Sequence, residues 1–146
     1  MIKNKIRSSV FVTVQFICLI AIAVTGEIIP KNKIYLLLTV LLFIPVIWAA
    51  ILMRRKINVF PDLRSGAEML TQGIYRYIRH PMYLSVLGVS LILVINDFSL
   101  MRFIIWIILT ADLILKMNYE EKLLSAAFKN YSEYKKQTKR LIPFIY

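Results

Sequence analysis

The stretch IYLLLTVLLFIPVIWAAILM, residues 34–53, contains no charged side chain and ends at the basic triplet Arg54-Arg55-Lys56. An α-helix needs about 20 apolar residues to cross the hydrocarbon core of a bilayer, and this run is long enough. Backbone polar groups in lipid must be paired within the segment, so a spanning segment of this kind is helical. The run therefore predicts a membrane-spanning helix.

Three further apolar runs flank this stretch. One precedes it, and two follow it with only a short turn-like connection at Asn96-Asp97 between them. Hydrophobic residues make up 59% of the chain, which is far more than a soluble domain uses. We therefore predict an all-α, polytopic membrane protein that forms a single domain over residues 1–146. Its four or so transmembrane helices are expected at residues 9–29, 34–53, 81–95 and 100–115.

The basic residues are distributed unevenly about these spans. Four spans place the N-terminus, the 54–80 loop and the C-terminal tail on one side of the membrane, and 16 of the 19 Lys and Arg residues lie there. Basic residues collect on the cytoplasmic side, so both termini are predicted to be cytoplasmic. The net charge of +11 then reflects basic loops at a membrane face and argues against a nucleic-acid partner.

The first span has a second interpretation. A basic start, an apolar stretch and Ala21-Ile22-Ala23 together are typical of a cleavable signal peptide. The apolar run continues past the alanines to Val24 and again at Ile28-Ile29, which favours an uncleaved anchor. Cleavage would leave the direction of the later spans unchanged.

Beyond the fourth span the chain is predicted to stay helical and to become amphipathic. Lysines occupy other faces of this segment, while apolar and aromatic residues recur at three- and four-residue spacing. The recurring positions are Leu124, Phe128, Tyr131, Tyr134 and Thr138. Such a helix would lie on the membrane surface or cap the cytoplasmic end of the bundle.

The residues that could carry chemistry gather where the third and fourth spans meet the cytoplasm. The short connection between these spans predicts a hairpin, which brings His80 close to Glu120 and Glu121. Pro81 suits the first turn of a helix, whose free amides attract an anion. The alternative is structural: His80 would cap the helix, and the acids would pair with neighbouring lysines. The residues alone do not predict the reaction.

The sequence contains no phosphate-binding or zinc-binding motif. The four glycines form no GxGxxG motif and no phosphate loop. One histidine and one cysteine do not suffice for a four-ligand zinc site, so no metal is predicted.

The chain nevertheless resembles a known family. The shared motifs are Gly73-x-Tyr75-Arg76-x-x-Arg79-His80-Pro81-x-Tyr83, the Glu120-Glu121 pair, Phe128 with Tyr131-x-x-Tyr134, and Arg140-Leu141-Ile142-Pro143. In this order and spacing, over residues 66–143, they resemble the isoprenylcysteine carboxyl methyltransferase family. Phospholipid N-methyltransferases share a looser form of the pattern.

This resemblance implies an integral membrane enzyme that transfers a methyl group from S-adenosylmethionine to a lipid-like acceptor. Glu120 would contact the cofactor, Lys116 would orient the acceptor, and Glu121 is a candidate base if the acceptor is an amine. The other residues that would line the cofactor pocket are Leu70, Tyr75, His80, Pro81, Met82 and Tyr83. The family pattern has an arginine at position 116 and a glycine at position 129, whereas this chain has lysine at both.

Two rival functions remain open from the sequence. One is a non-catalytic membrane protein that binds anionic lipid or a partner protein through its basic face. The other is a related membrane enzyme of the steroid-reductase type. The basic-then-apolar start favours the inner membrane of a prokaryotic cell.

Overall fold

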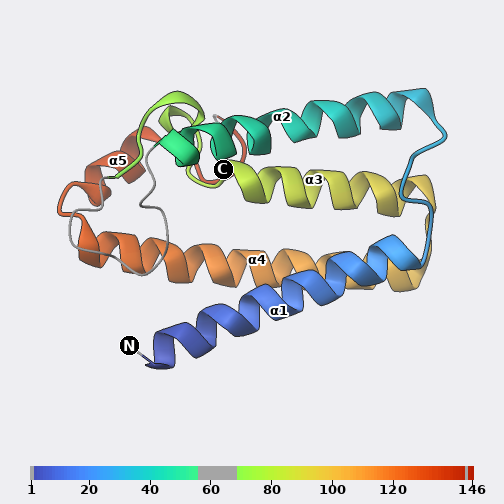
Figure 1. Ribbon diagram of the computed structural model, residues 1–146, viewed down its shortest axis with the longest axis horizontal. Coiled ribbons are helices and arrows are strands. Elements are labelled where there is room, and N and C mark those ends of the chain that lie inside the picture. Colours follow the sequence, from blue (N-terminus) through green and yellow to red (C-terminus); the bar gives the residue numbers. More distant parts are fainter. Residues whose placement is uncertain (1, 56–68, 144) are drawn as a thin grey trace. The chain divides into compact units, whose positions relative to one another are not determined.

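The computed structural model describes residues 2–55, 69–143 and 145–146 (Figure 1). Over these residues the secondary structure is helical, with a single isolated parallel bridge between Ile78 and Lys139. The elements are α1 (Ile2–Val24), α2 (Lys33–Arg55), the 3₁₀ helix η1 (Gly73–Arg76), α3 (Pro81–Asn96), α4 (Leu100–Ala127) and α5 (Tyr131–Gln137). The all-α prediction is therefore confirmed for the described part of the chain.

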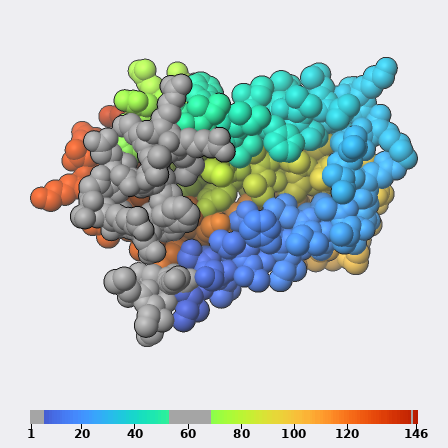
Figure 2. Space-filling model, viewed as in Figure 1, coloured from blue at the N-terminus to red at the C-terminus, as the bar shows by residue number. Residues whose placement is uncertain are grey.

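Two of these helices are long and apolar enough to cross a membrane, Ile6–Val24 in α1 and Lys33–Leu52 in α2. Their apolar side chains are mostly exposed, and both helices form part of the face seen in Figure 2. A helix in the core of a soluble protein would bury such side chains, so this exposure fits a lipid environment. Helix α3 is apolar but shorter, at 16 residues, so four spans remain a prediction.

Two predicted helix boundaries are wrong. Helix α1 ends at Val24 rather than continuing to residue 29, because Gly26 and Pro30 follow and neither favours a helix. The predicted continuous helix beyond Glu121 is broken between Ala127 and Tyr131, where a turn separates α4 from the short α5.

The described contacts divide the chain into two compact units. One contains residues 1–42 and 86–117, and the other contains residues 43–85 and 118–146. In the first unit the guanidinium of Arg102 is buried and donates to the carbonyls of Asp97 and Ile22, at 2.5 and 3.3 Å. Gly26 leaves room for that guanidinium, because a Cβ at position 26 would overlap it. Arg102 therefore ties the end of α1 to the turn between α3 and α4.

The second unit contains the predicted site residues. Its buried apolar cluster consists of Ala49 from α2 with Ile74 and Ile78, and Leu52 and Leu84 pack against them. Gly73 begins η1 with a φ of +61°, a left-handed conformation that side chains with a Cβ rarely adopt. The chain therefore turns sharply before it enters the segment that leads to His80.

Gly73→Ala is expected to lower the free energy of unfolding by about 1–3 kcal/mol, because a left-handed alanine is strained. Its Cβ would also lie 2.6 Å from Cδ1 of Leu52. Chemical denaturation in detergent micelles measures the loss. Gly73→Asn is the control, since asparagine tolerates this φ but still carries a Cβ. If the two variants lose equal stability, crowding against Leu52 rather than backbone strain is the cause.

Candidate active site

The approach to α3 is held by pairing with the C-terminal tail. Lys139 N–H donates to the Tyr77 carbonyl at 3.0 Å, and Arg79 N–H donates to the Lys139 carbonyl at 2.8 Å. His80 N–H then donates to the Arg140 carbonyl at 3.0 Å. These bonds hold residues 77–80 against residues 139–140 of the tail. Helix α3 begins at Pro81, which confirms the predicted start.

His80 caps this helix with its backbone and places its ring in the site. Its carbonyl accepts hydrogen bonds from the amides of Tyr83 and Leu84, at 3.1 and 3.2 Å. The imidazole stacks on the ring of Tyr83, with centroids 5.4 Å apart and planes inclined by 12°. The two rings therefore form one aromatic surface at the start of α3.

Glu120 joins this surface from α4. The Tyr83 hydroxyl donates to Glu120 Oε1 at 2.6 Å, and His80 Nδ1 lies 3.8 Å from Glu120 Oε2. The Glu120 side chain is 27% exposed, so solvent reaches a carboxylate that is already oriented by its neighbours. The predicted contact between the start of α3 and the acidic pair is confirmed. An oriented, accessible carboxylate beside two aromatic rings can bind a hydroxyl or an ammonium group.

Glu121 has a different environment, because its side chain is only 3% exposed and lies among cations. Arg79 Nε donates to Oε1 at 2.9 Å. Arg140 Nε and Nη2 donate to Oε1 and Oε2, at 3.1 and 3.0 Å. Lys135 Nζ lies 3.2 Å from Oε2. Glu121 therefore joins α4 to the segment before α3, to α5 and to the tail.

These cations determine the ionisation of Glu121. Burial acts to raise the pKa of Glu121, but the nearby His80, Arg140 and Arg79 outweigh it and hold the pKa well below its usual range. A carboxylate with so low a pKa is a poor proton acceptor. Glu121 is thus better suited to organise the site than to act as the base that the sequence suggested.

The imidazole of His80 lies between the two acids. Its Nε2 is 3.4 Å from Glu121 Oε1, but it is buried and has no hydrogen-bond partner in the described part of the chain. A buried nitrogen without a partner is uncommon and often marks a place where a bound molecule completes the bonding.

The remaining predicted pocket residues lie in the same unit. The Tyr75 carbonyl accepts a hydrogen bond from the Tyr134 hydroxyl at 2.6 Å, and burial, then the charge of Glu120, raises the pKa of Tyr75 to about 12. Pro81 is fully buried, Met82 is exposed, and Leu70 is partly buried ahead of η1. Tyr75 therefore remains a neutral phenol at physiological pH.

Lys116 belongs to the other unit, where its Nζ donates to Gln15 Oε1 of α1 at 2.9 Å. One turn earlier on α4, Asp112 is buried, and its Oδ2 has no hydrogen-bond partner among the described residues. Asp112 and Lys116 therefore form a polar region within the unit that contains residues 1–42 and 86–117. The role of Lys116 toward an acceptor stays a prediction.

Two contributors to the site, Arg79 and Arg140, were not predicted as such. Arg79 was noted only as part of the motif at residues 73–83, but its guanidinium is buried against Glu121 and Thr138. Arg140 was noted only as part of a motif, although it also binds Asn118 Oδ1 at 2.7 Å. The sequence did contain a signal for this role. Arg79 and Arg140 both belong to the shared motifs, and a buried arginine needs an acid as its partner.

Comparison with known proteins identifies one family. The model of the isoprenylcysteine carboxyl methyltransferase (ICMT) family matches residues 32–126, which include the described parts of α2, the start of α3 and both acids. No match was found among curated proteins or among solved structures.

Proposed function

Because the chain belongs to the isoprenylcysteine carboxyl methyltransferase family, a family of membrane methyltransferases, we propose that it transfers a methyl group from S-adenosylmethionine to a lipid-like acceptor. The observation that carries this proposal is the group formed by Tyr83, His80 and Glu120. It combines an accessible oriented carboxylate with an aromatic surface and a buried nitrogen that has no hydrogen-bond partner among the described residues.

These residues suit S-adenosylmethionine chemically. The cofactor has hydroxyl and ammonium groups that a carboxylate binds, and an adenine that stacks on aromatic rings. Glu120, Tyr83 and His80 would hold the polar groups and the ring system. The family resemblance adds further lining positions at Leu70, Tyr75, Pro81 and Met82.

When bound, the cofactor would supply an electrophilic methyl group: the acceptor would form a bond to the methyl carbon while the carbon–sulfur bond breaks and the neutral thioether leaves. A carboxylate or thiolate acceptor is already nucleophilic, so the protein needs only to align the two molecules and exclude water. The low pKa of Glu121 supports such an acceptor, since an amine would have to lose a proton first. Lys116 would orient the anionic acceptor.

The topology inferred from the sequence belongs to the same proposal. Both termini would face the cytoplasm of a prokaryotic cell, the cofactor would arrive from the cytosol, and the acceptor would arrive from the bilayer. The concentration of basic residues in the segments on one side supports this orientation.

The test is binding of S-adenosylhomocysteine to the detergent-purified protein, measured by calorimetry. The wild type is expected to bind at micromolar concentration, and His80→Ala is expected to lose at least ten-fold in affinity, since it removes both a ring and a polar contact. Tyr77→Phe is the control, because Tyr77 is an exposed residue of the same segment. Folded wild-type protein without binding, or His80→Ala with wild-type affinity, would refute the proposal.

A further inference from the structure

A cavity lies on the flank of α4 away from Glu120. It has a volume of about 550 Å³ and is lined by Asn118, Glu121, Lys122, Ser125, Lys135 and Arg140. Successive helix residues are rotated by about 100°, so positions 118, 122 and 125 share one side of α4 and Glu120 lies nearly opposite. The cavity therefore lies on a different side of α4 from Glu120, and Glu121, which contacts His80 at 3.4 Å, borders both.

The cavity carries an excess of positive charge. Three cations, Lys122, Lys135 and Arg140, face a single carboxylate. Glu121 Oε2 is already engaged by Lys135 at 3.2 Å and by Arg140 at 3.0 Å. Lys122 is exposed and has no ion-pair partner in the described segments. A cation beside a cavity whose acid is already satisfied is available for an external anion.

The donors in the cavity suit a phosphate group. Asn118 uses its Oδ1 to accept from Arg140, which leaves its amide N–H groups free to donate. Lysine is a compact charge that binds phosphate well, and Arg140 offers a planar guanidinium.

An apolar surface adjoins these cations. Arg140 Nη1 donates to the Tyr146 hydroxyl at 3.0 Å, and the guanidinium lies 5.9 Å from the centre of that ring. The amides of Leu141 and Ile142 both donate to the Tyr146 carbonyl at 2.8 Å, which folds the tail into a turn. Ile142, Ile145 and Tyr146 are nevertheless exposed, Ile145 by 75%. Exposed apolar and aromatic side chains next to cations are typical of segments at a membrane interface.

We propose that this cavity binds the phosphate headgroup of an anionic phospholipid, with the acyl chains against Ile142 and Ile145. The proposal does not rest on methyl transfer, because the side chains that would bind the phosphate are Lys122, Lys135 and Arg140 rather than Tyr83, His80 and Glu120, although Glu121 borders both places. Its occupation would anchor the end of α4 and the tail at the membrane surface.

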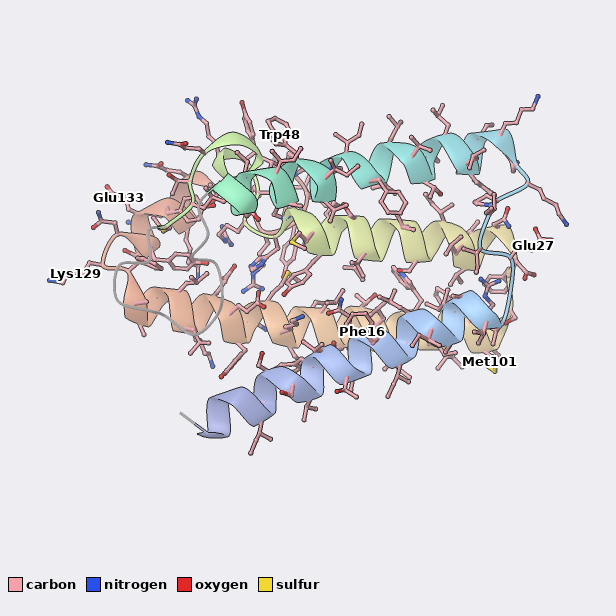
Figure 3. The ribbon with its side chains drawn as sticks, in the orientation of Figure 1. Phe16, Glu27, Trp48, Met101, Lys129 and Glu133 are labelled. Carbon is pink, nitrogen blue, oxygen red and sulfur yellow. The ribbon has the colours of Figure 1, made fainter. Side chains whose placement is uncertain are left out.

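The test titrates dioctanoyl phosphatidylglycerol into the full chain in maltoside micelles, with binding followed by calorimetry. Each lysine near an anionic headgroup is worth about five-fold in affinity. Lys122→Gln is therefore expected to weaken binding about five-fold, and Lys122→Gln with Lys135→Gln about thirty-fold. Lys129→Gln with Lys136→Gln is the matched control, since both lysines are exposed outside the cavity and the Lys129 side chain points away from the ribbon (Figure 3).

Three ligands complete the experiment. Dioctanoyl phosphatidylcholine, glycerol 3-phosphate and inorganic phosphate should all bind at least ten-fold more weakly, which would identify an anionic lipid as the ligand. If glycerol 3-phosphate binds as tightly as dioctanoyl phosphatidylglycerol, the proposal of a lipid ligand is wrong and the ligand is a soluble phosphate. Equal losses in the cavity and control pairs would overturn the site and indicate diffuse charge attraction.

Two further measurements control for loss of folding and for overlap with the cofactor site. Lys135→Gln removes a partner of Glu121 and so could destabilise the fold. If the double variant has a lower melting temperature than the wild type, the lipid affinity of the single variant Lys122→Gln decides the test. S-adenosylhomocysteine should bind Lys122→Gln as it binds the wild type. If cofactor affinity falls as much as lipid affinity, the cavity belongs to the cofactor site and the proposal is wrong.

Discussion

Glu121→Gln is expected to destabilise the protein by about 3–5 kcal/mol, the usual cost of removing one partner from a buried ionic cluster. Glutamine keeps the size of the side chain but removes the charge that Arg79 and Arg140 share. The Arg79 side chain is only 9% exposed, so its charge would be left buried without a carboxylate. Chemical denaturation in detergent micelles measures the loss.

The pH dependence of this loss follows from the lowered pKa of Glu121. A carboxylate with a lowered pKa stabilises the folded state above its ordinary pKa of 4.5 and loses that effect as the pH falls through its folded value. The stability difference between wild type and Glu121→Gln should thus stay constant from about pH 8 to 5. It should narrow only at more acidic pH.

Glu120→Gln is the matched control for this experiment, because it makes the same change at the neighbouring, more exposed acid. It should lose less than about 1 kcal/mol. If Glu120→Gln destabilises the protein as much as Glu121→Gln, the buried cluster does not carry the stability of this unit.

Local rules correctly predicted the parts of the site that depend on a few consecutive residues. Pro81 favoured the first turn of a helix and disfavoured helix at His80, and α3 begins at Pro81. The short connection after α3 predicted the meeting of His80 with the acidic pair, which the contacts of Glu120 and Glu121 confirm.

The features that the sequence did not predict depend on residues far apart in the chain. Residues 77–80 pair with residues 139–140, and no periodicity links two segments separated by about sixty residues. That pairing brings Arg140 to Glu121, which decides which of the two adjacent acids is buried.

The break after Ala127 was also missed, since the spacing of apolar residues continues through the turn and still buries Tyr131.

Glu120→Gln is expected to weaken S-adenosylhomocysteine binding by about 10- to 100-fold, because a hydrogen bond to a charged acceptor contributes about 1.5–3 kcal/mol. The residual 27% exposure of the Glu120 side chain leaves the carboxylate reachable by a ligand. Tyr83→Phe should have a smaller effect, since it removes the hydroxyl that orients Oε1 but keeps the charge and the stacked ring.

Lys116→Ala separates cofactor binding from turnover in the same assays. Lys116 is expected to act on the acceptor rather than on the cofactor, so this variant should bind S-adenosylhomocysteine like the wild type. Its rate of methyl transfer should fall, with Lys116→Arg restoring most of it because arginine keeps the charge. If Glu120→Gln binds S-adenosylhomocysteine with wild-type affinity, Glu120 is not part of the cofactor site. Loss of cofactor affinity in Lys116→Ala would instead mean that Lys116 contributes to cofactor binding.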